Sequence, residues 1–159
     1  GQLDSNMFKT IAQYRVPYVL MHMKGTPQNM TTQNQYDDLF GEIAFYLSEQ
    51  ILHLKALGVK DIILDPGFGF AKNISQNFQL LRSLDQFKIF NQPILVGLSR
   101  KSLIWRTLGI SAEEALNGTT VMNTIALQKG AGFLRVHDVK EARECVKLFE
   151  AYESAINEI

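Results

Sequence analysis

The sequence has little of several features that would define a class of protein immediately. It contains 159 residues but one cysteine, Cys145, so no disulfide can form within the chain, and a reducing, cytoplasmic compartment is expected. No apolar run approaches the roughly 20 residues of a membrane-spanning helix, and no basic stretch followed by an apolar one opens the chain. Sixteen basic residues balance 16 acidic ones, which argues against a nucleic-acid-binding surface. We therefore expect a single domain with neither a membrane nor a nucleic acid as its partner.

Several catalytic signatures are missing as well. The sequence has no Walker loop, no dinucleotide fingerprint, no Ser-His-Asp arrangement and no cluster of metal-ligand residues. The chain also begins at Gly1 without an initiator methionine and without a strand before its first helical pattern. We therefore expect it to be a piece of a longer protein.

Hydrophobic residues, which make up 46% of the chain, follow two patterns in alternation. Short apolar runs predict strands over 17–21, 62–64, 93–98 and 132–136. Apolar residues at helical spacing predict helices over 4–14, 35–57, 75–84, 102–108, 111–129 and from 138 onward. On the last helix we expect Ala142, Cys145, Phe149, Tyr152 and Ile156 to face inward. A polar loop over 28–34 carries no structural signal. Four strand-helix units in succession predict an α/β fold with a parallel sheet, either an open doubly wound sheet or half of an eight-stranded barrel.

Polar residues follow all four predicted strands at the point where each strand ends. In both architectures the carboxyl ends of parallel strands lie together, and that edge is where ligands bind. The four endings are Met21-His22, Asp65, Ser99-Arg100-Lys101 and Arg135-Val136-His137.

The most informative ending is the one after the strand over 62–64. Asp65 is the first polar side chain beyond the buried part of this strand, and Pro66, Gly67 and Gly69 then let the backbone turn sharply and approach a ligand closely. An ionised Asp65 can accept two hydrogen bonds from the N–H groups of a flat heterocycle. Phe70 and Met21 offer apolar surface for the faces of such a ring.

The two later endings predict anion binding. Arg135 and His137 are two residues apart on one strand, so their side chains point to the same side and offer donors to a phosphate. The stretch Ser99-Arg100-Lys101-Ser102 joins a strand to a helix, where backbone N–H groups, the Ser102 hydroxyl and the Lys101 ammonium can hold a carboxylate. A site for an N–H-rich ring, a phosphorylated group and a second anion favours group transfer with loss of a phosphate.

Other notable side chains have simpler interpretations. We expect Lys72 and Arg100 to be surface charges and Cys145 to be a small core residue. His22 is expected either to stabilise the end of its strand or to touch the substrate.

Four motifs together give the chain a resemblance to a known family. The order and spacing of these motifs resemble those of the dihydropteroate synthases. The resemblance also includes the stretch Asn117-Gly-Thr-Thr120. The motifs are Leu20-Met-His-Met23, Asp65-Pro-Gly-Phe-Gly-Phe70, Gly97-Leu-Ser-Arg-Lys-Ser102 and Leu134-Arg-Val-His-Asp138. The resemblance implies the second half, four βα units, of a (βα)8 TIM barrel. Residues 1–159 would then form a single pterin-binding domain without its N-terminal half, because whole barrels need roughly 250 residues.

The resemblance also implies an activity and the residues that serve it. Enzymes of this family condense 6-hydroxymethyl-7,8-dihydropterin diphosphate with p-aminobenzoate in folate biosynthesis and release pyrophosphate, assisted by Mg²⁺. Its metal ligand would come from the missing half, and the 113–129 helix would contribute to a homodimer. Lys101 and Asp65 would be catalytic. The pterin would contact Met21, Asp65, Gly69, Phe70, Leu95, Gly97 and Lys101; the diphosphate would contact Arg135 and His137; and p-aminobenzoate would contact Phe70, Ser99, Lys101 and Ser102.

Two alternatives remain open at this point. One is the pterin-binding domain of a corrinoid methyltransferase, which shares the barrel and the pterin aspartate but releases no pyrophosphate. The other is a non-catalytic fragment that folds and associates with itself, since an isolated half barrel exposes two sheet edges and an apolar interior. In either case we expect the chain alone to be inactive as a synthase.

Overall fold

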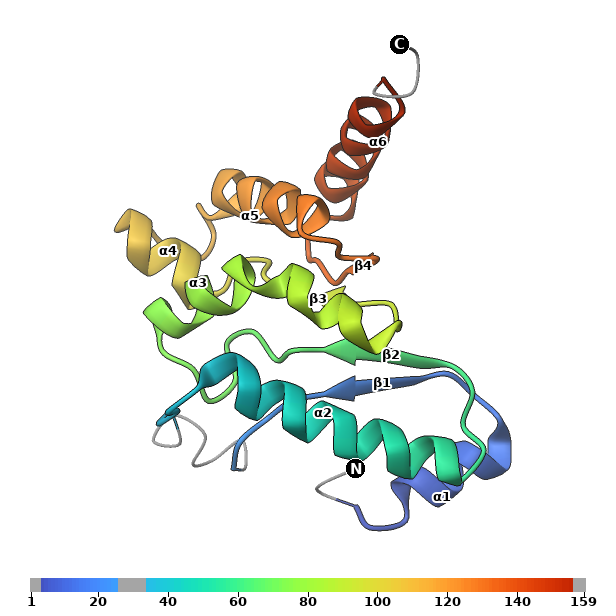
Figure 1. The fold of residues 1–159 in the computed structure, drawn as a ribbon. Helices are drawn as coiled ribbons and strands as arrows, with labels where there is room; N and C mark the ends of the chain where they lie inside the picture. The colour runs from blue at the N-terminus through green and yellow to red at the C-terminus, as the bar shows by residue number, and fades with distance from the viewer. Residues whose placement is uncertain (1–3, 26–33, 156–159) are drawn as a thin grey trace.

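A computed structural model describes residues 4–25 and 34–155 of the chain (Figure 1). Most of the loop predicted over 28–34 lies outside the described residues. The same holds for Ile156, which was predicted to face inward. Along the chain the elements are α1 (Met7–Tyr14), β1 (Tyr18–Met21), α2 (Leu39–Ala56), β2 (Ile62–Asp65), α3 (Ile74–Arg82), the 3-10 helix η2 (Leu84–Phe90), β3 (Leu95–Val96), α4 (Ser102–Leu108), α5 (Leu116–Gln128), β4 (Phe133–Leu134) and α6 (Val139–Ala155).

The four strands are parallel and follow one another in chain order, as predicted. β1 pairs with β2 in the register Tyr18↔Ile62 to Met21↔Asp65, and β3 pairs with β4 with Leu95 opposite Phe133. A parallel bridge between Leu64 and Ile94 joins the two pairs. The result is four βα units, the arrangement of half of a (βα)8 barrel.

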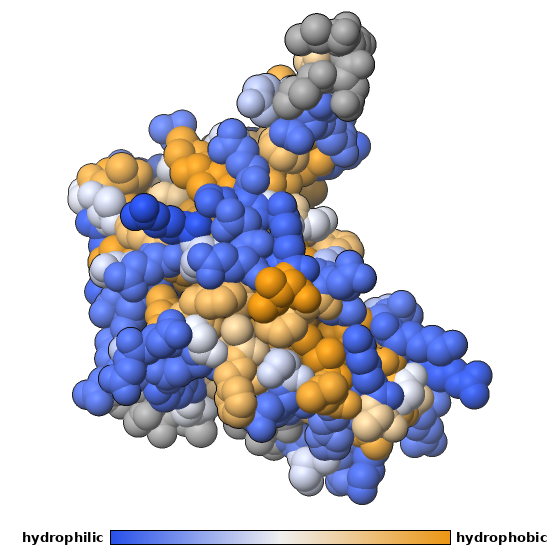
Figure 2. Space-filling view, in the orientation of Figure 1, coloured by the Kyte–Doolittle hydropathy of each residue, from blue (hydrophilic) through white to orange (hydrophobic). Residues whose placement is uncertain are grey.

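The two faces of this sheet have different surroundings. Alternate strand residues are packed under the helices in one hydrophobic core; Leu20, Ile62, Leu64 and Val96 are at most 1% exposed. Residues of the opposite face are more open, and Val19 and Phe133 are 41% and 46% exposed. Figure 2 shows that apolar surface remains visible between hydrophilic regions on the side of the molecule in view. The helices therefore cover one face of the sheet and leave the barrel-interior face open.

Local sequence signals explain where several helices begin and end. The Asp38 carboxylate accepts a bond from the Gly41 N–H and begins α2, and Gly58, with φ +87°, follows its end. Asn73 and Gln76 form a reciprocal capping box at the start of α3. Gly109, also with positive φ, ends α4 as predicted.

Several details differ from the prediction. β3 and β4 are shorter than the strands predicted over 93–98 and 132–136, and α2 begins at Leu39 rather than at residue 35. Residues 84–90, which follow the predicted helix over 75–84, form a 3-10 helix. α5 begins at Leu116, because the Glu114 carboxylate bonds to the Ser111 N–H within a turn that precedes the helix. On α6, Ala142 and Cys145 are buried as predicted, but Tyr152 is 59% exposed, because the C-terminal turns of α6 extend beyond α5 (Figure 1).

The close packing of α4 on α5 generates a stability prediction. A Cβ atom on Gly118 would lie 2.4 Å from Cγ2 of Ile104 and 3.1 Å from Cδ1 of Leu108. We expect Gly118→Ala to lower the free energy of unfolding by about 1–3 kcal/mol, because the two helices must separate. Gly132→Ala is the matched control, since its Cβ would meet nothing closer than 3.8 Å. Equal urea midpoints for the two variants would contradict the packing described.

Candidate functional site

The carboxyl ends of the strands bring most of the predicted site residues to one edge of the sheet. The Met21–Asp65 pair ends the β1–β2 register, and the His22 N–H donates to the Asp65 carbonyl over 2.9 Å. The Arg135 N–H donates to the Val96 carbonyl, which continues the β3–β4 ladder past Leu134. This edge therefore carries side chains from all four strands, as the sequence predicts.

Asp65 ends β2 as a buried carboxylate, only 4% exposed. Its Oδ1 accepts a hydrogen bond from the Gly67 N–H over 2.8 Å. Burial raises the pKa of Asp65, whereas the bond from Gly67 and the positive charges of Lys101, Arg135 and Lys72 oppose that rise. A carboxylate with three cations around it is prepared to accept hydrogen bonds from a ligand.

The turn that follows Asp65 needs glycine at two positions. Gly67 has φ +77°, and a Cβ atom there would lie 1.9 Å from the His22 carbonyl oxygen. Gly69 also has φ +77°, and its Cβ would lie 3.1 Å from Cδ of Lys101. The turn can therefore pack directly against β1 on one side and Lys101 on the other.

Lys101 extends from the β3–α4 connection to this turn. Its Nζ donates to the Phe68 carbonyl and lies 5.0 Å from the centre of the Phe70 ring. Burial lowers the pKa of Lys101 to about 8; the charge of Asp65 raises it and that of Arg135 lowers it. The two predicted catalytic residues, Asp65 and Lys101, thus lie in one electrostatic cluster with the aromatic side chain of Phe70.

A second polar cluster lies at the ends of β3 and β4. A pocket of about 300 Å³ is lined by Gly97, Ser99, Arg100, Lys101, Arg135, Val136 and His137. Ser99 Oγ accepts from the His137 N–H over 3.2 Å and lies 2.9 Å from His137 Nδ1. Which of these two atoms donates depends on the tautomer of the ring; in either case the contact engages Nδ1 and not Nε2 of His137. Ser99 therefore orients His137.

Arg135 depends on a glycine neighbour. A Cβ atom on Gly97 would lie 3.1 Å from both Nε and Nη2 of Arg135. The Nε–Nη2 edge of the guanidinium therefore approaches the space beside Gly97 that a side chain would fill. Arg135 is exposed, so its donors are open to a ligand.

Three further predicted residues flank these clusters. Met21 and Leu95 are partly buried; Leu95 lies two residues before Gly97 on the same face of β3. Ser102 is the first residue of α4 and is also partly buried.

The two residues predicted to be surface charges have structural partners instead. Arg100 makes two bonds to Asp138, of 2.9 and 2.8 Å, and two more to the carbonyls of Ala112 and Glu113. Arg100 is still a partly exposed charge, whereas the prediction for Lys72 is wrong, because its Nζ bonds to His22, Gly67 and Phe70. Both side chains fold back over the backbone, which residue type alone does not reveal.

Sequence reasoning also missed Asn77 of α3. Asn77 is 3% exposed, and its Oδ1 accepts from the Gly69 N–H over 2.7 Å. Its Nδ2 donates to the carbonyls of Lys72 and Asn73. The sequence did offer one indication of this role: Asn77 is a polar residue on the inward side of α3, just after the capping box that begins the helix.

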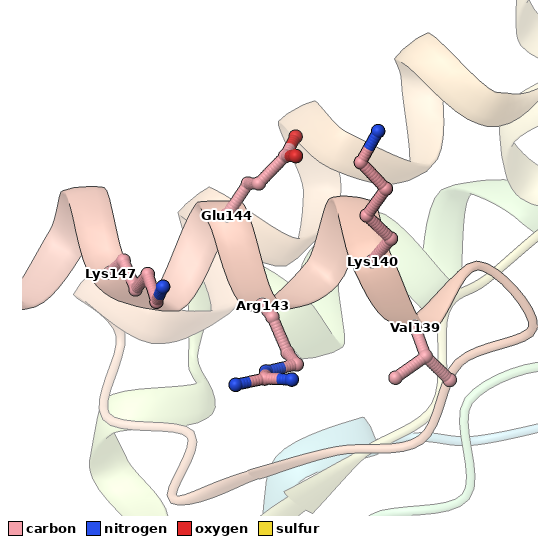
Figure 3. A pocket seen from close by; sticks show the side chains of 5 residues that line it. All are labelled: Val139, Lys140, Arg143, Glu144 and Lys147. Carbon is pink, nitrogen blue, oxygen red and sulfur yellow. The ribbon is translucent and has the colours of Figure 1, made fainter.

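Other surfaces of the described residues carry less chemistry. A hollow on α6 is lined by Val139, Lys140, Arg143, Glu144 and Lys147, whose side chains point in different directions rather than toward one centre (Figure 3). Over residues 4–25 and 34–155 no group of three His, Cys, Asp or Glu side chains could hold a metal ion. Within the same residues, no helix is both long and apolar enough to cross a membrane.

Comparison with known proteins defines the class first. A model of the pterin binding enzyme family matches residues 1–137, so the chain belongs to that family. Among characterised relatives, the dihydropteroate synthase of Escherichia coli K12 is 44% identical over 154 residues, which are 96% of this chain and 55% of that protein. A bifunctional dihydropteroate synthase/dihydropteroate reductase of Helicobacter pylori is 38% identical over 96% of this chain and 40% of its own.

Solved structures of dihydropteroate synthases are similar as well. The Yersinia pestis enzyme in complex with a sulfonamide drug superposes with a TM-score of 0.92 at 38% identity, over 95% of this chain and 56% of that one. The Thermus thermophilus enzyme in complex with 6HMPPP superposes with a TM-score of 0.89 at 37% identity, over 93% and 60%. These likenesses confirm the predicted fold class. The chain spans about half the length of the relatives it matches.

The charge cluster around Lys101 generates a prediction that needs no ligand. The Cε resonance of Lys101 should titrate in carbon NMR with a pKa of about 8. Asp65→Asn should lower this pKa, since a neighbouring negative charge is lost, and Arg135→Ala should raise it, since a neighbouring positive charge is lost. Arg106→Ala, on the exposed part of α4, is the control. An identical titration in all variants would contradict the arrangement.

Proposed function

We propose that this chain supplies one side of the active site of a dihydropteroate synthase. The enzyme would condense 6-hydroxymethyl-7,8-dihydropterin diphosphate with p-aminobenzoate to give 7,8-dihydropteroate and pyrophosphate. The observation that supports this most is the single edge where a buried carboxylate, Asp65, lies beside Lys101 and next to the pocket of Arg135 and His137. Residues 1–159 would act as one pterin-binding unit of the barrel.

In this proposal the pterin ring binds against the turn after β2. Asp65 would accept two N–H bonds from the ring, while the Lys101 ammonium would donate to a ring acceptor. Phe70 and Met21 would line the ring, with Gly69, Leu95 and Gly97 as walls that leave room for it. A Cβ atom on Gly69 would lie 3.1 Å from Lys101, and one on Gly97 would lie 3.1 Å from Arg135. A larger residue at either position would therefore crowd the neighbouring cationic side chain.

The diphosphate would bind in the adjoining pocket. Arg135 offers a planar set of donors, and His137, oriented by Ser99, would donate from its Nε2. The carboxylate of p-aminobenzoate would lie near Ser102 and Lys101, with its ring near Phe70 and Ser99. These assignments put the leaving group and the nucleophile on either side of the pterin methylene carbon.

The proposed reaction breaks the bond between that methylene carbon and the diphosphate oxygen, and forms a bond from the carbon to the aromatic amine nitrogen. The amine loses a proton, and pyrophosphate leaves with the bonding electrons. Arg135 and His137 would stabilise the charge that develops on the leaving oxygen. A Mg²⁺ ion would supply further positive charge, and its ligands would have to come from elsewhere, because no group of three His, Cys, Asp or Glu side chains within 4–25 and 34–155 could hold it.

The corrinoid methyltransferase alternative shares the ring site but has no use for a diphosphate pocket. The Arg135–His137 pocket and its supporting Ser99 therefore favour the synthase. The names of the similar proteins, all dihydropteroate synthases or a bifunctional form, support the same choice.

The first test of the proposal concerns the ring. Asp65→Asn presents a donor where the ring needs an acceptor, so pterin affinity should fall by on the order of 2–4 kcal/mol. Calorimetry with 6-hydroxymethylpterin measures this loss, and Asp61→Asn, an exposed carboxylate before β2, is the control. Because about 1.4 kcal/mol corresponds to a tenfold change in affinity, the expected loss is well above tenfold. A loss of affinity under about twofold would show that Asp65 does not bind the ring.

The second test concerns the anion. Arg135→Ala should weaken pyrophosphate binding far more than binding of an unphosphorylated pterin, because only pyrophosphate carries the charge that Arg135 meets. Arg143→Ala, which removes an exposed cation from α6, should change neither. Equal weakening of both ligands by Arg135→Ala would show that Arg135 supports the fold or the ring instead.

The third test concerns the chain by itself. Four βα units supply four of a barrel's eight strand ends, so we propose no measurable synthase activity for this chain alone. We also propose self-association, as a homodimer, because Val19 and Phe133 leave apolar surface on the open face of the sheet. Light scattering at micromolar concentration should give a mass above that of one chain.

Phe133→Lys should shift this mass toward one chain, whereas Leu148→Lys, on an exposed position of α6, should not. A wild-type chain that remains monomeric would refute the association. Turnover comparable to that of the full-length relatives would refute the claim of inactivity.

A further inference from the structure

Side chains bond several backbone polar groups of the turn between Asp65 and Lys72. Gly67 N–H donates to Asp65, and Gly69 N–H donates to Asn77 of α3. The carbonyl of Phe68 accepts from Lys101. The turn is thus held from β2, from α3 and from the β3–α4 connection, since a buried backbone group without a partner is costly.

Lys72 provides the remaining attachment, to β1. Its Nζ donates to the Gly67 carbonyl over 3.0 Å and to the Phe70 carbonyl over 3.1 Å, and it lies 3.2 Å from His22 Nδ1. An ammonium group has three donors, and two carbonyl oxygens with one imidazole nitrogen are three acceptors. Lys72 is therefore saturated, with no hydrogen left to bond to a substrate.

His22 is fixed on its other sides as well. Its N–H donates to the Asp65 carbonyl, its own carbonyl oxygen lies where a Cβ on Gly67 would clash, and its ring meets the edge of the Tyr46 ring at 5.2 Å. Burial, followed by the charges of Lys72 and Lys24, lowers the pKa of His22 to about 3, while Glu42 opposes the shift. His22 is thus a neutral acceptor for Lys72 at ordinary pH.

We propose that Lys72 is a positioning residue for the ring-binding turn: by bonding both ends of the Gly67–Phe70 turn and His22, it holds Asp65 and Phe70 at the places the pterin requires. The inference rests on the proposed function, since it assigns a purpose to the turn that would bind the ring. Lys72 does not touch the ligand; it acts through the turn.

The electrostatic surroundings of Lys72 are consistent with this role. Burial lowers its pKa to about 7, the charge of Asp65 raises it, and that of Lys101 lowers it. Asp65 and Lys101 are thus the charged groups that act on the pKa of Lys72, and the neutral His22 ring contacts its Nζ. At pH 6 the ammonium form predominates, so all three of its bonds are present.

Hydrogen exchange at pH 6 tests whether Lys72 holds the turn, without any ligand. The Phe70 N–H, which bonds to the Gly67 carbonyl within the turn, should exchange about tenfold or more faster in Lys72→Met than in the wild type. Amides in the middle of α2 should change less, which shows that the variant is folded. Lys60→Met, at an exposed position before β2, is the matched control and should leave the Phe70 amide unchanged.

Calorimetry with two probes then separates positioning from a general structural effect. Lys72→Met should weaken 6-hydroxymethylpterin binding about tenfold or more and change pyrophosphate affinity by less than about twofold, because Lys72 does not line the anion pocket, which meets the turn through the bond of Lys101 to the Phe68 carbonyl. Unchanged exchange at Phe70, or faster exchange with unchanged pterin affinity, would overturn the inference. A wild-type chain that binds no pterin would count against the proposed function instead, and exchange alone would then decide whether Lys72 holds the turn.

Discussion

The arrangement at the strand ends depends on one buried carboxylate surrounded by an excess of positive charge. Asp65 is nearly inaccessible, and Lys72, Lys101 and Arg135 all act on it. One negative charge cannot neutralise three cations, so the edge of the sheet retains a positive potential that favours a polyanion. Burial lowers the pKa of both lysines, because removal from water disfavours their charged forms.

Backbone geometry makes this cluster possible. Gly67 brings the turn onto the carbonyl of His22, Gly69 leaves room for Lys101, and Gly97 leaves room for Arg135. At each position a methyl group would displace a neighbour that carries charge or bonds the turn. The glycines thus set the distances between cations and carboxylate, and the side chains supply the chemistry.

The direction in which the site faces follows from the alternation of the strands. Core residues such as Leu64 and Val96 point toward the helices, so Asp65 and Gly97, one position further along, point to the opposite side. That open side is the interior of a barrel in the solved relatives' fold class. A ligand there would be enclosed only when further strands, or another copy of the chain, cover the open face.

Much of this was predictable from local signals. Apolar runs that end in Asp65, in Ser99 and in Arg135 indicated parallel strands with polar carboxyl ends, and the glycines indicated a close approach of the backbone. The role of Lys72 was not predictable, because it depends on a side chain folding back to His22, 50 residues earlier in the chain. The exposure of Tyr152 was missed because periodicity does not specify where a helix loses its packing partner. The 3-10 helix after α3 was also missed, although Leu84 and Phe87 within it are buried in the core.

The central claim is that the strand ends, and not another surface, bind a pterin and a phosphate anion side by side. Amide NMR spectra of the isotopically labelled chain, recorded with 6-hydroxymethylpterin and pyrophosphate added separately and together, test this most directly. We expect the pterin to shift the amide resonances of Asp65, residues 67–70 and Gly97, and pyrophosphate to shift those of Ser99 and residues 135–137. Shifts confined to α6 or to the helix-covered side of the sheet, with the strand ends unchanged, would contradict it.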